Sequence, residues 1–252
     1  MRLFVLIYML FVTVVLPSPA MALVTDLSNN KIEIRYSFDG AQLILFGAVG
    51  TSLQDPDSSP YEVVVVVRGP NSETVVRKKE KVGVIWVNKQ NITFPSAPGY
   101  YAVAASTSLD QIAPAEVFEK YGIGFDYLPL VVRSDEGVSA PKPAFRDALF
   151  RLRSGEELFR QEQDSVTKLT QGLFRTDIYL PANVPVGDFV VETFLFQDGK
   201  IKDRSRIKLD VGKEGFERAA YDFAHGSPFL YGLTAVVVAL SAGWLAGVLG
   251  KK

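Results

Sequence analysis

Hydrophobic and polar residues alternate over two early stretches of the chain, which predicts β-strands with one buried face. Every second residue between positions 31 and 38 is apolar, and a second apolar stretch follows at positions 41–49. Asp39-Gly40 separates the two stretches, and this dipeptide favours the tight turn with positive φ angles that joins antiparallel strands. We therefore expect residues 31–49 to form a β-hairpin.

A second hairpin is predicted much later in the chain. Residues 206–211 alternate in the same way, the apolar-rich stretch 188–196 precedes them, and Asp198-Gly199 lies between the two stretches. Residues 61–68 differ because they contain five consecutive valines, so apolar side chains must face both sides of the strand. This run indicates a central strand that is covered on both faces.

The strand pattern predicts a mainly β fold: an immunoglobulin-like β-sandwich with a helical insertion, followed by one C-terminal transmembrane helix. Residues 73–87 and 100–106 supply further strands. Residues 94–101 and 180–189 each place two prolines and a glycine before an aromatic residue, as immunoglobulin-like sandwiches do before a late strand. This likeness fits a duplicated module, but one composite sandwich is the preferred interpretation.

Between the strand blocks the periodicity changes to that of helices. Residues 109–121 have a short helical pattern that Pro114 interrupts, and residues 143–163 have a longer one. Ser154 and Glu157 have the spacing of a capping box, which allows the longer helix to restart there. We expect a helical insertion at about residues 109–163.

The uncharged run at residues 223–250 is long enough to cross a bilayer, which takes about 20 apolar residues. With about 100° between successive helical residues, its small side chains gather within an arc of roughly 120°. Small residues let two helices approach closely, so we predict that this face packs against another helix, although glycine and alanine are common in membrane helices generally. The predicted packing residues are Gly232, Ala235, Ala239, Gly243, Gly247 and Gly250.

Residues 1–22 have the features of a secretory signal peptide: Arg2, an apolar stretch, and the small-x-small cleavage site Ala20-Met21-Ala22. The apolar stretch has about 14 residues and is short for a retained anchor. Export would leave the C-terminus in the cytoplasm. The expected organisation is a periplasmic sandwich at 23–212, a juxtamembrane amphipathic helix at 213–226, a transmembrane helix at 227–250 and a cytoplasmic tail at 251–252.

Few residue types are available for chemistry, because the chain has no cysteine and a single histidine, His225. The lack of thiols excludes disulfides, haem attachment and thiolate metal sites. His225 lies next to the predicted membrane surface, and Asp222 precedes it by three residues, within reach of a hydrogen bond. We interpret Asp222 and His225 as a juxtamembrane contact rather than a catalytic or pH-sensing pair. The sequence predicts no enzyme, cofactor or metal site.

The charge of the chain argues against nucleic acid as a partner. The formal net charge is −1, and without Arg2, Lys251 and Lys252 the predicted exported part carries about −4. One local exception is the basic run from Arg77 to Lys81. Lysines on an exposed strand prevent edge-to-edge aggregation, and this interpretation is favoured over contact with anionic lipid headgroups.

The order of these features resembles one known family. The leader, the Ile/Val-rich strands, Leu180-Pro181 followed by Pro185-x-Gly187, and the segment AHGSPFLYG at residues 224–232 are together similar to the Alph_Pro_TM family of transmembrane proteins of Alphaproteobacteria. The resemblance implies a bacterial inner-membrane protein without an assigned activity. It also implies an association with permeases of the sulfite-exporter type, because relatives are often encoded beside them.

Two functions are compatible with this sequence. In the first, the protein is a periplasmic accessory or scaffold subunit that docks its small-residue helix face on a polytopic protein of the inner membrane. In the second, the sandwich binds a small molecule or envelope component of unknown identity and relays its presence through a membrane partner. A deep pocket with converging polar groups would favour the second function, and a broad apolar patch joined to the helix face would favour the first.

Overall fold

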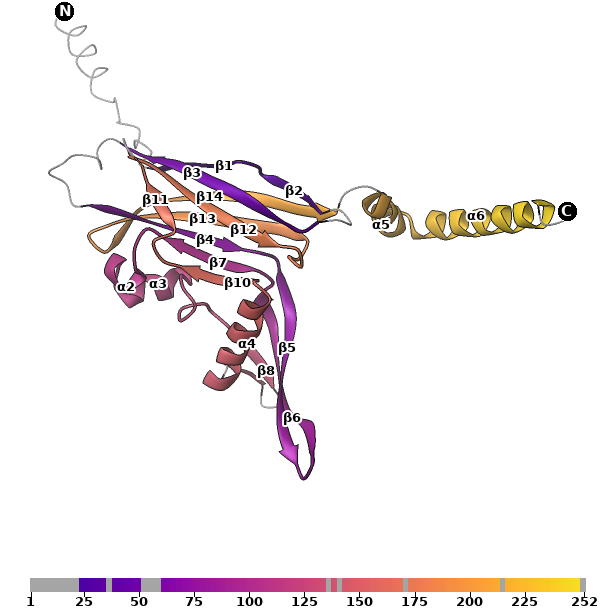
Figure 1. Cartoon of the computed structure of the whole chain (residues 1–252), viewed down its shortest axis with the longest axis horizontal. Coiled ribbons are helices and arrows are strands. Elements are labelled where there is room, and N and C mark those ends of the chain that lie inside the picture. Colours follow the sequence, from indigo (N-terminus) through magenta and orange to yellow (C-terminus); the bar gives the residue numbers. More distant parts are fainter. Residues whose placement is uncertain are drawn as a thin grey trace, which may run out of the picture.

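Figure 1 shows a computed structural model of the chain, in which two β-sheets face each other, a long hairpin projects from one end and two helices follow at the C-terminus. The structure describes residues 23–34, 38–50, 60–134, 137–139, 142–169, 172–213 and 216–249. The predicted signal peptide (1–22), Gly250 and the tail (251–252) lie outside these residues. The mainly β class with one C-terminal apolar helix is confirmed, whereas the immunoglobulin-like assignment stays a prediction.

The larger sheet has six strands in the order β10-β7-β4-β13-β14-β2. Strand β4 lies between β7 and β13, and the five valines at 63–67 are each no more than 1% exposed, as expected for a strand covered on both faces. Strands β13 and β14 form the predicted hairpin through Asp198 and Gly199, which have φ angles of 52° and 71°. The six strands are β10 (Phe159–Glu162), β7 (Tyr101–Ala105), β4 (Tyr61–Arg68), β13 (Gly187–Gln197), β14 (Lys200–Lys213) and β2 (Lys31–Ile34).

The second sheet of the sandwich covers one face of the first. It has four strands in the order β1-β3-β12-β11, which are β1 (Leu23–Leu27), β3 (Gly40–Val49), β12 (Leu173–Pro181) and β11 (Val166–Lys168). Hydrogen bonds join the sheets: Thr25 donates from Oγ1 to Ser205 Oγ over 2.6 Å, and the Tyr100 hydroxyl donates to the Tyr179 carbonyl oxygen over 2.6 Å. Lys168 Nζ on β11 donates to the Tyr61 carbonyl oxygen at 2.9 Å and to the Glu62 carboxylate at 2.8 Å. The space between the sheets is filled by one continuous hydrophobic core.

A third sheet stands apart from the sandwich and is built on a long hairpin, β5 (Asn71–Val82) and β6 (Ile85–Pro98). We call residues 71–98 the arm. It is inserted between β4 and β7, which pair with each other in the six-stranded sheet, so the chain leaves and re-enters that sheet at one point. Two short strands, β8 (Val132–Ser134) and β9 (Gly137–Ser139), continue the third sheet beside β6.

The hairpin predicted for residues 31–49 is wrong, because its two strands belong to different sheets. Strand β2 pairs in parallel with β14, and strand β3 pairs with β1 and β12. Strand β1, which the sequence did not single out, aligns Leu23 with Val49 and takes the place beside β3. Local alternation and a turn dipeptide therefore found the strands but not their partners.

The predicted insertion at residues 109–163 is only partly helical. Helices α2 (Leu109–Ile112) and α3 (Ala115–Tyr121) flank Pro114 as expected, and α4 is Pro143–Gly155. The same segment also supplies β8, β9 and β10. The helical prediction for 143–163 is wrong beyond Gly155: Glu157 takes a φ of 59°, and Phe159 is buried against Tyr101 with ring centroids 6.0 Å apart. Adding β10 to the edge of β7 buries this phenylalanine, which a restarted helix would not do.

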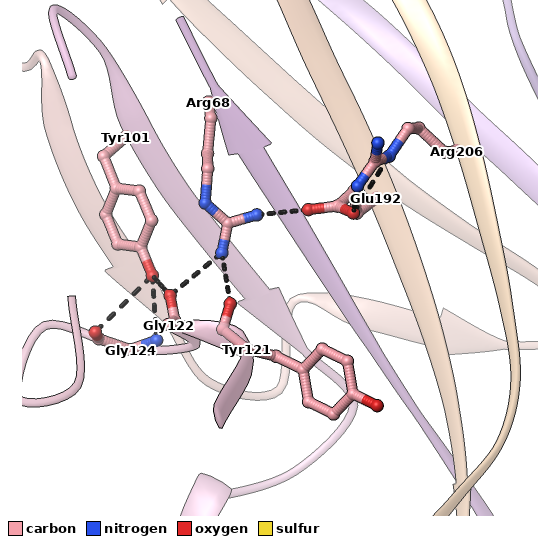
Figure 2. Close-up of polar contacts among 7 residues, drawn as sticks. All are labelled: Arg68, Tyr101, Tyr121, Gly122, Gly124, Glu192 and Arg206. Carbon is pink, nitrogen blue, oxygen red and sulfur yellow. Dashed lines mark hydrogen bonds and ion pairs between the residues drawn. The ribbon is translucent and has the colours of Figure 1, made fainter. Parts of the chain in front are cut away.

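Helix α3 covers the outer face of the six-stranded sheet, and a polar cluster holds it there (Figure 2). The Glu192 carboxylate on β13 accepts from Arg68 Nη1 at 2.5 Å and from Arg206 Nη2 at 2.7 Å. The other amino group of Arg68 donates to the carbonyl oxygens of Tyr121 and Gly122, at 2.8 and 3.0 Å. A buried carboxylate thus fixes the guanidinium that binds the end of α3.

Tyr101 fastens the turn that follows α3. Its buried hydroxyl donates to the Gly122 carbonyl oxygen at 2.8 Å and accepts from the Gly124 N–H at 2.9 Å. Both glycines have positive φ angles, 62° and 96°, which side chains with a Cβ rarely adopt. Burial raises the pKa of the Tyr101 phenol to about 12, an effect that the nearby Arg68 guanidinium opposes.

Glu192→Ala should lower the free energy of unfolding by about 3 kcal/mol, because it leaves the guanidinium of Arg68 without its carboxylate in a largely buried place. The measurement is urea denaturation of the detergent-solubilised protein followed by circular dichroism. The control is Asp177→Ala, which breaks an exposed pair with Arg175 and should cost less than about 1 kcal/mol. Equal losses in the two variants would show that the cluster does not hold α3.

Alkaline pH should destabilise the fold through Tyr101. Its pKa is about 12 in the folded protein and about 10 in an unfolded chain, so its stabilising contribution is present below pH 10 and is lost as the pH rises to 12. Tyr101→Phe removes this titrating group and should make stability fall less steeply across that window. Parallel curves for the wild type and the variant, from thermal melts at a series of pH values, would contradict the assignment.

Candidate functional site

The cluster around Glu192 joins three strands and the end of α3, but its bonds leave little capacity for chemistry. Both carboxylate oxygens accept from arginines, and two of the Arg68 nitrogens are engaged. Three arginine N–H groups fill most of the acceptor positions of this carboxylate, which leaves little capacity for a general base. Among the residues that the structure describes, no three His, Asp or Glu side chains gather where they could hold a metal ion.

Four hollows formed by described residues are small and open. Their volumes are about 40 Å³ between the sheets at Tyr100 and Tyr179, 220 Å³ beside Asp198, 260 Å³ between the arm and α4, and 270 Å³ over Phe46 and Leu173. Pockets for small ligands usually hold about 300–1,000 Å³. These hollows therefore give the ligand-binding interpretation little support.

Helix α6 (Pro228–Leu249) is the element with the clearest functional geometry. At 1.5 Å per residue its 22 residues extend about 33 Å, enough for the hydrocarbon core of a bilayer. Among the described residues, α6 is the one helix that is both long enough and apolar enough to span a membrane, over Pro228–Gly247. None of that span is buried against the rest of the protein. The hydroxyls of Thr234 and Ser241 donate to carbonyl oxygens one turn earlier, so these polar groups are satisfied within the helix.

The predicted small-residue face of α6 is uncovered. A Cβ placed on Gly232, Gly243 or Gly247 would meet no atom within 4 Å, and Ala235 and Ala239 are exposed. Glycine inside a helix is about 1 kcal/mol less favourable than alanine. Packing within this chain therefore does not explain the three glycines. Gly250, the sixth predicted residue, lies outside the described residues.

The junction between the domain and α6 is a second helix, α5 (Phe216–Gly226). Its end is tied to the start of α6, because the Ser227 N–H donates to the Phe223 carbonyl oxygen and the Tyr231 N–H donates to that of Ser227, each at 3.0 Å. The rings of Phe223 and Tyr231 meet edge to face, with centroids 5.8 Å apart. Three aromatic residues, Phe223, Phe229 and Tyr231, lie at this level of the chain, where the surface of a bilayer would favour them.

His225 contacts Tyr221 in the structure. The two rings stack with centroids 4.0 Å apart, and His225 Nδ1 lies 2.9 Å from the Tyr221 carbonyl oxygen, in position to donate to it. Asp222 lies in the same helix, but its side chain is outside those described. Sequence reasoning missed Tyr221, although its i, i+4 spacing from His225 is the signal that would have found it.

Comparison with known proteins now gives the family. The family model described as "Putative transmembrane protein (Alph_Pro_TM)" matches residues 22–252, which is all but the first 21 residues. The search of curated proteins gave no match. The family description agrees with the apolar helix α6, which carries the one candidate membrane span of the described residues. This chain therefore belongs to the Alph_Pro_TM family of transmembrane proteins.

Proposed function

We propose that this protein is a non-enzymatic, membrane-anchored accessory or scaffold subunit that docks on an integral membrane protein through the small-residue face of α6. The observation that carries this proposal is the uncovered row formed by Gly232, Gly243 and Gly247. Lipid tails contact bulky side chains well, whereas a helix partner can approach a glycine face closely. A partner helix gives these glycines the packing role that their own chain does not.

The proposed location of the sandwich, α6 and the C-terminal residues rests on the leader predicted at residues 1–22. Its removal on export leaves the sandwich in the periplasm, α6 in the inner membrane and the last residues in the cytoplasm. The association implied by the family resemblance makes a sulfite-exporter-type permease the first partner to test. The alternative, a ligand-binding module that relays through a membrane partner, needs a larger pocket than the hollows described above.

Site-specific cross-linking tests the docking face. A photoreactive amino acid in place of Ala239 should form an adduct with a membrane protein several-fold more efficiently than one in place of Val237, which lies about 160° around α6 from Ala239. Mass spectrometry of the adduct, formed in intact membranes, identifies the neighbour.

A matched pair of variants supplies the control. Gly243→Leu with Gly247→Leu should strongly reduce the Ala239 adduct, because the added side chains hold the helices apart, while Val237→Leu with Val238→Leu should leave it unchanged. Adducts of equal yield from both faces, or equal yields in both double variants, would refute docking through this face.

Topology is tested separately. Alkaline phosphatase fused after Lys213, the last residue of β14, should be active because that enzyme needs an oxidising compartment. Protease added to spheroplasts should remove the sandwich and leave α6 in the membrane. An inactive fusion together with full protection would place the domain in the cytoplasm instead.

A further inference from the structure

The far end of the arm exposes a small apolar cluster. Val84, Ile85 and Trp86, at the turn between β5 and β6, are 94%, 59% and 66% exposed, and Gly83 opens the turn with a φ of 63°. Exposed single apolar residues are ordinary, but three consecutive ones at the tip of a projecting hairpin are not explained by folding. We call Val84, Ile85 and Trp86 the arm tip.

Positive charge surrounds the arm tip. The stretch from Arg77 to Lys89 contains five basic residues and one acidic residue. In the ladder, Lys81 lies directly opposite Trp86, and Lys79 lies opposite Asn88. Residues directly opposite each other share one face of an antiparallel ribbon, so Lys79, Lys81 and Trp86 form a cationic and aromatic face.

Protection of a sheet edge explains only part of this pattern. Strand β5 is an edge strand of the third sheet, and lysines on such a strand discourage pairing with other chains. The same reasoning would place polar residues at the turn, where Val84, Ile85 and Trp86 are found instead. The positive charge therefore lies beside an apolar tip, and preventing strand β5 from pairing with other chains does not account for both features.

The base of the arm lies beside α4 as far as Lys79, and beyond it the arm is a two-stranded ribbon. Arg153 of α4 donates to Thr74 Oγ1 at 3.0 Å, and Thr93 pairs with Arg133 of β8. Beyond these points, the strand pairing between described residues is that of β5 with β6 alone. A two-stranded ribbon is only marginally stable in water, so its outer part gains from contact with a surface.

The sheet topology places the arm and the membrane helix at the same end of the sandwich. Strands β4 and β14 both run antiparallel to β13, and Arg68 and Lys208 both pair with Val190. The arm that follows β4 and the helices that follow β14 therefore leave the same end of the six-stranded sheet. Figure 1 shows the arm and the helices α5 and α6 projecting from that end of the sandwich in different directions.

We propose that the arm tip, with Lys79 and Lys81, is a second membrane contact that inserts into the surface of an anionic phospholipid bilayer. Tryptophan favours the interface, the aliphatic side chains enter the acyl boundary, and the lysines meet the phosphates. Because α6 already holds the domain at the bilayer, a weak contact is sufficient, since the second binding event is intramolecular. Two contacts would fix the tilt of the sandwich, whatever protein packs against α6.

The sequence offers a direct probe, because the chain has two tryptophans and Trp244 lies in α6. Full-length protein carrying Trp244→Phe has Trp86 as its only tryptophan. It is reconstituted into vesicles of phosphatidylcholine, with or without roughly one third phosphatidylglycerol. With phosphatidylglycerol, Trp86 emission should move to shorter wavelength and lose about half its intensity when the lipids carry bromine near the headgroup. In phosphatidylcholine alone both effects should be much smaller.

Charge reversal provides the control. Lys79→Glu with Lys81→Glu should abolish the quenching in vesicles with phosphatidylglycerol, whereas Lys200→Glu with Lys202→Glu, at the opposite end of β14, should leave it intact. Circular dichroism establishes that each variant is folded. Unshifted, unquenched Trp86 emission in anionic vesicles would overturn the proposal. So would a blue shift that depends on protein concentration and not on lipid, because the tip would then be covered by a second copy of the chain.

Discussion

Burial of strand β4 on both faces is the constraint on which the rest of this domain depends. Five valines in succession leave no solvent face, so one side needs the four-stranded sheet and the other needs the α2–α3 segment. Polar bonds help to hold these covers in place. Thr25 with Ser205, Tyr100 with Tyr179 and Lys168 with Glu62 lie between the sheets. Arg68 and Tyr101 bind the end of α3 and the turn after it. Without cysteine, the domain depends on this packing alone.

How far the sequence predicts the fold depends on how local the signal is. The valine run and the Asp198-Gly199 hairpin carry their information within a few residues, and both are found as expected. Strand β2 was assigned the wrong partner because its alternation is compatible with any sheet edge. The periodicity predicts helix where β10 forms, because Phe159 gains its burial from Tyr101, more than fifty residues away. Pairings between distant segments are set by tertiary burial, which periodicity does not report.

The candidate sites also divide into those that local spacing locates and those that only the tertiary structure reveals. The small face of α6 could be located from spacing alone, because a helix turns a one-dimensional pattern into a face. The stacking of Tyr221 on His225 was predictable from the same geometry. The arm tip was not, because its basic run fits an edge strand equally well. Only the structure shows that Val84, Ile85 and Trp86 lie at the end of a ribbon without a covering element among the described residues.

The glycines of the sandwich and those of α6 differ in what surrounds them. At Gly47 on β3, a Cβ would lie 2.4 Å from the Phe174 ring and 2.6 Å from the Val24 carbonyl oxygen, so this glycine is required by the chain's own core. At Gly243 and Gly247, the same addition meets nothing within 4 Å. Both kinds of glycine forgo the stability that alanine would give a regular element. In the sandwich the reason is visible in the fold, so in α6 the reason must be sought in the membrane around it.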